Sequence, residues 1–395
     1  MKKNVIFIIN NLNCGGAEKG LISLLETLDY SRYDVDLFLF KHEGLFYKKV
    51  PSQVNILDEP LEFRYYDMPI KQAIFKALKE KRFDITLSRI QAGIIFKTER
   101  NLARCEQRVW KYLSKVVNAP SKNYDVSIGF LEKNPIYFSV DNVKAKKKIG
   151  FIHTDYEKLQ MDPKIDAKYF EKLSHIVTVS NESSNVLKNI FPENSDKITV
   201  IKNIVSANTI RKMSLDNIYC EKKDITIVSV GRLHSAKGFD LAIEACDLLL
   251  KKGYKVLWYV VGEGPERNKL ESIINEKKIN NNFKLVGMQE NPYPYIKMCD
   301  IYVQTSLFEG SCISITEAKI LRKPIVSTNF RSISDQIIDG VNGLIVDMKA
   351  EEIMKGIVSL IEDQRMRNKI VSNLSDESLG NEEEVNKLYD IIDVT

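Results

Sequence analysis

The chain has no long hydrophobic run. No apolar stretch in its 395 residues approaches the roughly 18–20 residues that a membrane-spanning helix needs. The start, MKKNVIFIINNLNCGG, superficially looks like a secretion signal, but its apolar core at Val5–Ile9 is short and no small-residue cleavage site follows. We interpret this segment as a buried β-strand and expect a cytoplasmic protein, peripheral at most at the inner face of the cytoplasmic membrane.

Paired cysteines and the common catalytic motifs are also missing. The six cysteines stand at positions 14, 105, 220, 246, 299 and 312, and none belongs to a C-x-x-C motif, so no zinc cluster or redox motif is indicated. The Walker, H-E-x-x-H and G-x-S-x-G motifs do not occur. We expect no metal, no cofactor and no nucleic-acid partner.

Two partial motifs carry little weight. The D-V-D at 34–36 matches the D-x-D of metal-dependent sugar transferases, but it begins a predicted strand and lies far along the chain from the other candidate residues. The G-E-G at 262–264 is half of a dinucleotide fingerprint, with Pro265 following and no third glycine. We read the first as chance and find NAD binding unsupported.

Charge is unevenly distributed along the chain. Residues 1–202 contain 33 Lys and Arg against 25 Asp and Glu, which is +8, and residues 203–395 contain 25 against 28, which is −3. Together they give the net charge of +5. The basic N-terminal half is suited to an acidic partner.

Short Val- and Ile-rich runs alternate with helical patterns throughout the chain. Continuous apolar strands separated by helices indicate parallel sheets covered on both faces. The predicted strands are Val5–Ile9, Val35–Phe40, Val54–Leu57, Phe83–Leu87, Asp125–Phe130, Lys148–His153, Ile176–Val179, Asp224–Gly231, Val256–Gly262, Phe283–Val286, Ile301–Gln304 and Pro324–Ser327. Helices are predicted at Ala17–Leu28, Gly238–Lys252, Pro265–Lys278 and Ile313–Leu321.

The pattern restarts after about residue 203. The join, Asn203–Lys223, is polar and has no clear strand signal. We therefore predict an α/β fold of two Rossmann-like doubly wound domains, 1–203 and 204–375, facing across a cleft. Open sheets of this type bind ligands at the carboxyl ends of their strands.

Two segments in the first half are basic and amphipathic. Residues 71–82 and 97–115 are predicted to form helices with several Lys and Arg. One interpretation is that both are solvated surface helices. The other is that they meet anionic lipid or a phosphate-bearing acceptor.

Two glutamates stand eight residues apart in the segment F-E-G-S-C-I-S-I-T-E-A. Glu309 lies in a loop, and Glu317 lies in the second turn of a helix that begins near Ser311–Ile313. Gly310 permits a close approach of the backbone, and the N–H groups at a helix start favour an anion. We expect one carboxylate to accept hydrogen bonds from a sugar and the other from a ribose.

Two cations follow a predicted strand. Gly231 ends the strand, and Arg232 and Lys237 lie in the loop before the next helix. Two positive charges beside a helix start suit a diphosphate.

Two features of the first half lie at the carboxyl ends of predicted strands. Gly15 and Gly16 form a turn between the first strand and the first helix, a reduced version of a glycine-rich phosphate turn. His153, one of only four histidines, ends a predicted strand. The alternatives are a plain tight turn and a structural histidine.

With these residues in view, the chain resembles glycosyltransferase family four, which has the GT-B fold. The Glu309 and Glu317 pair looks like the family's E-x7-E motif, and Arg232 with Lys237-Gly238 looks like its phosphate-binding pair. Further similar segments are Gly15–Glu18, Gly287–Tyr295, Lys323–Thr328 and Asp339–Gly343. The stretch 376–395 resembles the terminal helix that packs back onto the N-terminal domain, so 1–203 is expected to bind the acceptor and 204–375 the donor.

The resemblance implies roles for single residues. Arg232 and Lys237 would stabilise the donor diphosphate, Glu309 would bind the transferred sugar, and Glu317 the ribose. Met288 would touch the base through its backbone, the N–H groups of Gly310, Ser311, Cys312 and Ile313 would face the sugar or phosphate, and His153 would lie near both. Ser311 and Cys312 depart from residues frequent in relatives, which leaves the donor's identity open.

The expected activity is a retaining hexosyl transfer. The donor would be a nucleotide-sugar, most simply a UDP-sugar, and the acceptor a saccharide, in particular a lipid-linked one, in cell-surface polysaccharide synthesis. A soluble acceptor is the rival. Two other functions stay open, a sugar-nucleotide epimerase of the same fold and a non-catalytic sugar-nucleotide binder.

Overall fold

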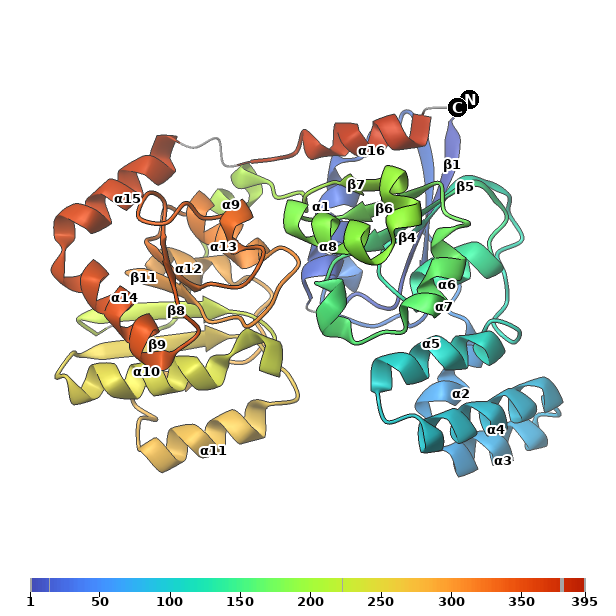
Figure 1. Cartoon of the computed structure of the whole chain (residues 1–395), viewed down its shortest axis with the longest axis horizontal. Coiled ribbons are helices and arrows are strands. Elements are labelled where there is room, and N and C mark those ends of the chain that lie inside the picture. The colour runs from blue at the N-terminus through green and yellow to red at the C-terminus, as the bar shows by residue number, and fades with distance from the viewer. Residues whose placement is uncertain (1, 14, 222, 377–379, 394–395) are drawn as a thin grey trace. The chain divides into compact units, whose positions relative to one another are not determined.

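The computed structural model describes residues 2–13, 15–221, 223–376 and 380–393. The chain forms two compact units, residues 1–203 with 383–395, and residues 204–382 (Figure 1). Among the described residues, no helix combines the length and the hydropathy that crossing a membrane requires.

The first unit is built on a seven-stranded parallel sheet in the order β3-β2-β1-β4-β5-β6-β7. Its strands are β1 (Lys3–Ile9), β2 (Tyr33–Leu39), β3 (Asn55–Ile56), β4 (Tyr124–Gly129), β5 (Ala145–Ile152), β6 (His175–Thr178) and β7 (Ile198–Val200). Its helices are α1 (Gly16–Thr27), α2 (Arg64–Asp67), α3 (Ile70–Lys79), α4 (Phe83–Thr98), α5 (Leu102–Leu113), α6 (Asn134–Asp141), α7 (Pro163–Phe170), α8 (Asn181–Ile190) and α16 (Glu384–Asp393).

The second unit is built on a six-stranded parallel sheet in the order β10-β9-β8-β11-β12-β13. Its strands are β8 (Ile225–Val230), β9 (Val256–Val261), β10 (Phe283–Leu285), β11 (Ile301–Gln304), β12 (Ile325–Thr328) and β13 (Leu344–Val346). Its helices are α9 (Ala207–Met213), α10 (Phe239–Lys251), α11 (Arg267–Lys277), α12 (Tyr293–Met298), α13 (Ile313–Ile320), α14 (Ala350–Glu362) and α15 (Gln364–Asp376).

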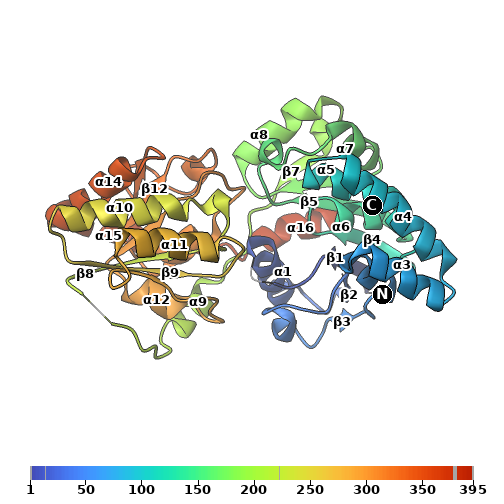
Figure 2. The ribbon, with the colours of Figure 1, turned by 90° about the horizontal axis from the view of Figure 1, so that it is seen from below.

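Both faces of the second sheet are buried. Ile227 and Trp258 pack on one face with α10, α11, α14 and α15, whereas Val228 and Leu257 pack on the other with α9, α12 and α13. Figure 2 shows helices on both sides of these strands. Because neighbouring strand residues point to opposite faces, two apolar faces require the continuous apolar strands of the sequence.

The last helix of the chain belongs to the first unit. On α16, the carboxylate of Asp393 lies 3.0 Å from Lys3 Nζ and accepts a 2.9 Å hydrogen bond from the hydroxyl of Tyr33. The ring of Tyr389 stacks on Tyr33, with centroids 5.4 Å apart. The helix begins at Glu384, whereas 376–395 was the predicted stretch, and residues 377–379 and 394–395 of that stretch lie outside the described residues.

Several predicted elements were wrong or missing. Phe83–Leu87 is the start of helix α4 and not a strand, because the apolar spacing of this segment continues with the helical period as far as Ile94. The helix predicted over 97–115 begins at Leu102, where Asn101 caps it by accepting a 3.0 Å hydrogen bond from Arg104 N. The edge strands β7 and β13, three residues each, were not predicted.

Helix α9 was also missed. The polar join at 203–223 contains this short helix, which begins after Ser206, whose side chain accepts a hydrogen bond from Thr209 N. A single cap residue before seven helical residues gives little periodic signal.

Gly262 and Gly253, both in the second unit, have positive φ but different surroundings. A Cβ atom on Gly262, φ +154°, would lie 1.9 Å from the carbonyl oxygen of Gly231. A Cβ atom on Gly253, φ +91°, would have no atom within 4 Å. Gly262 therefore lets the loops after β8 and β9 pack backbone against backbone.

We expect Gly262→Ala to lower the free energy of unfolding of the second unit by at least about 2 kcal/mol more than Gly253→Ala. Both alanines are strained by their φ, at a cost of about 1–2 kcal/mol, and only the first also overlaps backbone. Urea unfolding followed by tryptophan fluorescence in a Trp110→Phe background measures this unit, because Trp258 is then the remaining tryptophan. Equal destabilisation by the two alanines would contradict the packing argument.

Candidate functional site

The candidate site of the second unit lies where its strand order reverses, between β8 and β11. The two strands are neighbours and run parallel, with Ile301 paired to Ile227. Their carboxyl ends therefore meet at one edge of the sheet, and the loops 231–238 and 305–312 start there. Doubly wound sheets bind ligands at this point.

The two loops are joined through their backbones. Gly238, φ +59°, has no room for a side chain, because a Cβ atom would lie 2.2 Å from Thr305 O. The Thr305 hydroxyl donates to Lys237 O at 2.8 Å, and Leu307 N donates to Ala236 O at 2.8 Å. These contacts fix the position of Lys237 relative to the loop that follows β11.

Lys237 and Glu309 form an ion pair across these loops. Both side chains are largely buried, with 20% and 15% exposed. Burial alone would lower the pKa of Lys237, but the charge of Glu309, the neighbouring Cys312 and the hydrogen bond to Glu309 together outweigh it, and the pKa is raised. Lys237 therefore stays protonated at neutral pH.

A buried chain of hydrogen bonds runs from strand β11 to Glu309 and holds its carboxylate in place. The Tyr302 hydroxyl donates to Gln304 Oε1 at 2.8 Å, and Gln304 Nε2 donates to Ser306 Oγ at 2.7 Å. Ser306 Oγ in turn donates to Glu309 Oε1 at 2.6 Å. The sequence analysis missed these residues, and the signal was the polar run Q-T-S, which begins at the last residue of an apolar strand.

Arg232 differs from Lys237 in being exposed. No residue that the structure describes forms an ion pair or hydrogen bond with its guanidinium. Gly231, the residue before it, lies against the side chain of Lys237, since a Cβ atom there would be 3.3 Å from two of its methylene carbons. The loop therefore presents one paired and one unpaired cation.

The start of helix α13 adds backbone donors to the same edge. Cys312 N donates to Gln336 Oε1 at 2.9 Å, and Gln336 Nε2 donates back to Cys312 O at 2.8 Å. Ile313 N and Ser314 N have no acceptor among the described residues. They are N–H groups of the first helical turn, which attract an anion. Of the N–H groups predicted to face a ligand, that of Cys312 is thus already paired.

The remaining residues of this loop are less open. Gly310 is buried and Ser311 is half-buried. The Cys312 thiol is buried and lies 3.2 Å from Ser314 Oγ, and burial raises its pKa to about 11. Ser332 Oγ donates to Glu309 O at 3.0 Å, which holds the loop from a further segment.

Glu317 and Glu309 have different environments. Glu317 projects from α13 and is 1% exposed, with the Tyr293 hydroxyl 3.4 Å from its Oε1. Glu309 is tied to a lysine and a serine in the preceding loop. Nothing in these contacts makes the two carboxylates an acid and base pair.

Met288 lies beyond the carboxyl end of β10. Its side chain is 46% exposed, and Gly287 before it, φ +78°, pairs with Gly262 through a 2.9 Å hydrogen bond. The G-E-G segment at 262–264 thus positions neighbouring loops. A Cβ atom on Gly264 would also lie 2.3 Å from Leu233 O.

In the first unit, His153 follows β5 beside two aromatic rings. Its ring lies 4.8 Å from that of Phe130 and 5.8 Å from that of Phe151, centroid to centroid. Its backbone N–H donates to Glu132 at 3.1 Å. Neither ring nitrogen has a hydrogen-bond partner among the described residues. Burial lowers the pKa of His153 to about 4 against the charge of Glu132, so the ring is neutral at pH 7.

Gly15 and Gly16 lie at the carboxyl edge of the same sheet. Gly15 precedes α1 with extended backbone, and the Glu18 carboxylate occupies the space beside it, 2.1 Å from where a Cβ atom would be. Gly16 is exposed, with no atom within 4 Å of that point. Cys14 lies outside the described residues.

The D-V-D segment contributes to the first unit's packing. Asp36 is buried, and its carboxylate accepts hydrogen bonds from Asn55 at 2.8 Å and Tyr124 at 2.7 Å. Lys122 Nζ lies 3.2 Å from it. Within the described residues, no three His, Cys, Asp or Glu side chains are grouped as a metal site requires.

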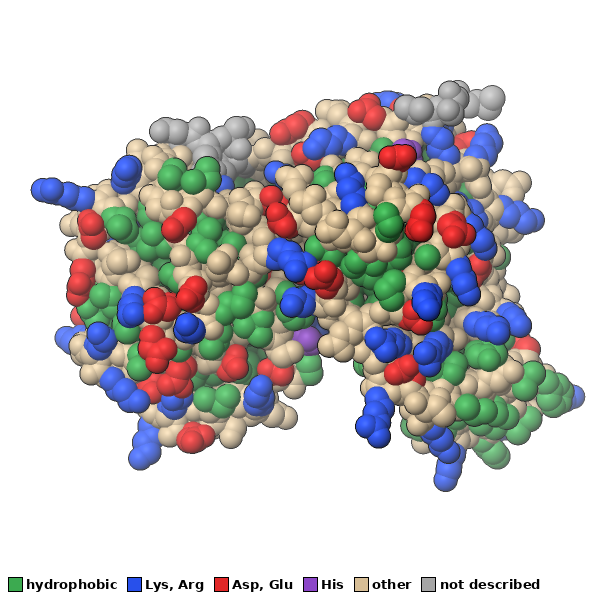
Figure 3. Space-filling model, in the orientation of Figure 1, with side chains coloured by type: hydrophobic (Ala, Val, Ile, Leu, Met, Phe, Trp, Pro, Cys, Tyr) green, Lys and Arg blue, Asp and Glu red, His purple; other side chains and the backbone are tan. Residues whose placement is uncertain are grey.

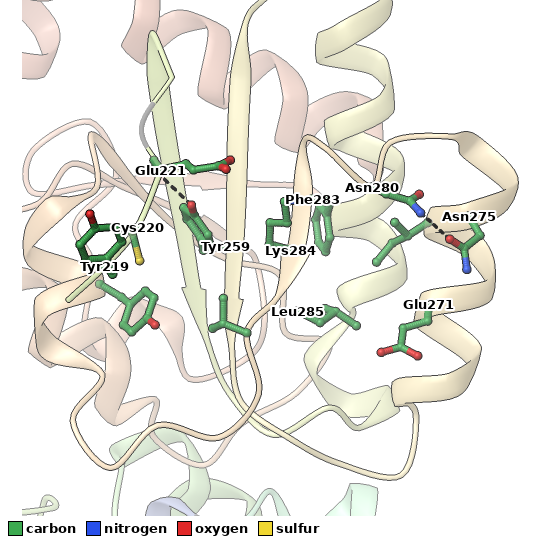
Figure 4. A pocket seen from close by; sticks show the side chains of 13 residues that line it. Tyr219, Cys220, Glu221, Tyr259, Glu271, Asn275, Asn280, Phe283, Lys284 and Leu285 are labelled. Atoms are coloured by element: carbon green, nitrogen blue, oxygen red, sulfur yellow. Dashed lines mark hydrogen bonds between the residues drawn. The ribbon is translucent and has the colours of Figure 1, made fainter.

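A pocket of about 490 Å³ lies along the edge strand β10 (Figure 4). Tyr219, Cys220 and Tyr259 line one side of the strand, and Glu271 and Asn275 line the other. None of the predicted site residues lines it. Its position along the edge strand, rather than at the strand ends, separates it from the site above.

The family described as "Glycosyl transferases group 1" matches residues 216–376. N-acetylgalactosamine-N,N'-diacetylbacillosaminyl-diphospho-undecaprenol 4-alpha-N-acetylgalactosaminyltransferase of Campylobacter jejuni is 25% identical over 376 residues, covering 93% of this chain and 92% of that protein. An uncharacterised glycosyltransferase of Methanocaldococcus jannaschii is 26% identical over 171 residues, so this chain spans 42% of that relative's length.

The fold is also that of solved structures. A mutant of Staphylococcus aureus TarM, in complex with Fondaparinux, alpha-GlcNAc-glycerol and UDP, superposes with a TM-score of 0.69 at 15% identity. The match covers 99% of this chain and 100% of that one. Residues 216–376 thus match the group 1 glycosyltransferases, the chain is similar over most of its length to a named glycosyltransferase, and its two parallel-sheet units are those of the GT-B fold.

Proposed function

We propose that the chain transfers a sugar from a UDP-sugar to a lipid-linked saccharide, with retention at the anomeric carbon, in the assembly of a cell-surface polysaccharide. The observation that carries the proposal is the Lys237–Glu309 ion pair beside the unpaired Arg232, at the switch point of the second sheet. Positive charge in this position suits the diphosphate of a nucleotide-sugar.

Stabilising the leaving group is the main task of such a site. When the bond between sugar and phosphate breaks, negative charge develops on the diphosphate. Arg232, Lys237 and the N–H groups at the start of α13 are donors already in place for that charge, and donors of this kind lower the barrier without reorganising. No part of this step requires a metal ion or a cofactor.

Glu309 and Glu317 would position the donor. The carboxylate of Glu309 shares Lys237 with the incoming phosphate and accepts hydrogen bonds from hydroxyls of the transferred sugar. Glu317 would accept from the ribose hydroxyls and Met288 would meet the base through its backbone, as the family resemblance implies. Ser311 and Cys312 border the sugar in this assignment.

His153, with Gly15 and Gly16, would act from the first unit. A neutral imidazole whose nitrogens lack protein partners can both donate to and accept from a ligand. We assign it to the sugar and its phosphate, and the glycine turn to backbone contacts with the donor or acceptor.

Retention and the UDP donor are supported by what the relatives contain. The S. aureus structure holds UDP together with alpha-GlcNAc-glycerol, and the name of the C. jejuni relative specifies an alpha linkage. Common UDP-hexoses are themselves alpha-linked, so an alpha product retains the configuration. Glu309 is held by Lys237 and Ser306, which is unsuited to a nucleophile, and the departing phosphate would take the acceptor's proton.

The acceptor assignment draws on the first half of the chain. The C. jejuni relative is named for an acceptor on diphospho-undecaprenol. The basic segments 71–82 and 97–115 would bring the chain to an anionic membrane surface, at the inner face of the cytoplasmic membrane.

We expect Lys237→Ala and Arg232→Ala each to lower sugar transfer at least about a hundredfold, the scale of losing one donor to a developing oxyanion. Arg232→Ala should keep the wild-type melting temperature to within a few degrees, whereas Lys237→Ala should lower it, because the largely buried Glu309 carboxylate loses its partner. The assay incubates a panel of sugar nucleotides and scores transfer or donor hydrolysis. Lys255→Ala is the matched control. Lys255 is exposed and precedes β9, so it lies at the amino end of the strands, away from the carboxyl ends that carry the site.

Four results would contradict the proposal. Wild-type turnover in either variant would remove the phosphate assignment. Isomerised sugar nucleotide formed without an acceptor would indicate an epimerase, and binding without transfer or hydrolysis a sugar-nucleotide binder. A product of inverted configuration, read from its anomeric proton coupling, would exclude retention.

Ser306→Ala tests the support under Glu309. Losing one buried hydrogen bond to a carboxylate costs about 1–3 kcal/mol, so we expect kcat to fall by about 5- to 160-fold. The donor KM should change little, because Arg232 and Lys237 remain. Ser359→Ala removes a hydroxyl on α14 that donates to Gly356 O at 2.8 Å and serves as the control. An unchanged kcat would show that Ser306 does not position Glu309.

A further inference from the structure

Exposed apolar side chains are concentrated in one helical segment. Ten of the sixteen large hydrophobic residues exposed among the described residues lie between positions 61 and 102. They are Leu61, Ile70, Phe75, Leu78, Phe83, Leu87, Ile90, Ile94, Phe96 and Leu102. Figure 3 shows a hydrophobic area at the lower right, where Figure 1 places α3 and α4, with Lys and Arg side chains around it.

Helix α4 carries the centre of this area. Phe83, Leu87, Ile90 and Ile94 recur at helical spacing and form one outward stripe, with exposed fractions of 68%, 59%, 43% and 57%. The opposite face of α4, with Ile85 and Ala92, is buried in the first unit. A helix that is apolar on both faces is typical of one covered on both faces.

The stripe is not needed to hold the helical hairpin together. Ala73 and Ala77 on α3 are fully buried, and the side chain of Ile70 fills the space beside Gly93 on α4. Small residues at these positions let α3 and α4 pack closely through their inner faces. The outward stripe is left exposed by this packing.

Cationic side chains surround the stripe. Residues 70–111 contain 11 Lys and Arg against 4 Asp and Glu, a net +7. Five exposed lysines, Lys71, Lys76, Lys79, Lys81 and Lys97, form no ion pair with any described residue. Of the acidic side chains at the turn, Asp84 pairs with Arg82 at 2.8 Å and Glu80 accepts from the Tyr65 hydroxyl.

We propose that the hairpin α3–α4 docks on an anionic lipid surface, with the stripe Phe83, Leu87, Ile90 and Ile94 inserted at the boundary of the headgroups and acyl chains. The apolar stripe suits the acyl chains of such a surface, and the Lys and Arg side chains that border it suit the anionic headgroups. A second copy of this chain fits poorly, because an isologous contact would place +7 against +7.

This inference deepens the proposed function and rests on it for its purpose. A lipid-linked acceptor lies in the membrane, and docking through this hairpin would place the first unit beside it. Vesicle binding itself needs neither donor nor acceptor, so its failure and the failure of sugar transfer are separate results.

The test is co-sedimentation of the full chain with vesicles of phosphatidylcholine alone or mixed with phosphatidylglycerol. We expect binding to the mixed vesicles that weakens with salt, since surface charges are screened. Leu87→Glu with Ile94→Glu should lower binding at least about tenfold, because two apolar side chains that would be buried in the membrane are lost. Leu87→Trp with Ile94→Trp should retain it, since tryptophan favours the membrane interface.

The controls separate this surface from a general loss of structure. Ile338→Glu places the same charge on an exposed apolar residue of the second unit, 62% exposed, and should bind as wild type. Donor hydrolysis in solution should be unchanged in all these variants. Wild-type binding by the Leu87→Glu, Ile94→Glu variant would overturn the proposal. So would a wild-type dimer that this variant dissociates, with no vesicle binding in either.

Discussion

The ion pair between Lys237 and Glu309 is the contact on which the proposed donor site depends. It links the loop after β8 to the loop after β11, and it satisfies a largely buried carboxylate and a largely buried ammonium together. Either charge without its partner would lower the stability of the folded state, so each residue requires the other. The pair keeps Lys237 protonated, and Ser306 and the buried amide of Gln304 hold Glu309 in place.

The fold supplies this contact through its strand order and its glycines. Parallel strands place the ends of β8 and β11 side by side at the switch point. Gly238 and Gly262 then let backbone meet backbone where any side chain would overlap a carbonyl oxygen. The charged residues are thus carried by loops whose geometry is fixed by packing, and donors that do not have to reorganise are those that stabilise a transition state best.

Much of the fold could be read from the sequence, for a physical reason. Strands buried on both faces, such as Val256–Val261, are continuous apolar runs, and β11 was predicted at its observed bounds. The same rule failed at Phe83–Leu87, where a helix that is apolar on two faces has a short run that looks like a strand. The three-residue edge strands have too few residues to show any period.

The candidate site was predictable where charge follows a strand. Arg232, Lys237 and Glu309 stand out because they are charged and occupy loops at strand ends. Ser306 and Gln304 were missed, since a polar residue at the end of a buried strand looks like the start of a loop. The bonds of Gln336 to the backbone of Cys312, 24 residues away, leave no local pattern at all.

The central claim, that Arg232 and Lys237 bind the donor diphosphate, is tested most directly by calorimetric titration with UDP and with uridine. The account predicts that the wild-type protein binds UDP at least about a hundredfold more tightly than uridine, because charged hydrogen bonds contribute about 1.5–3 kcal/mol each. In the Arg232→Ala, Lys237→Ala double variant the two ligands should bind with similar, weak affinity. A double variant that still prefers UDP as strongly as the wild type would contradict the account.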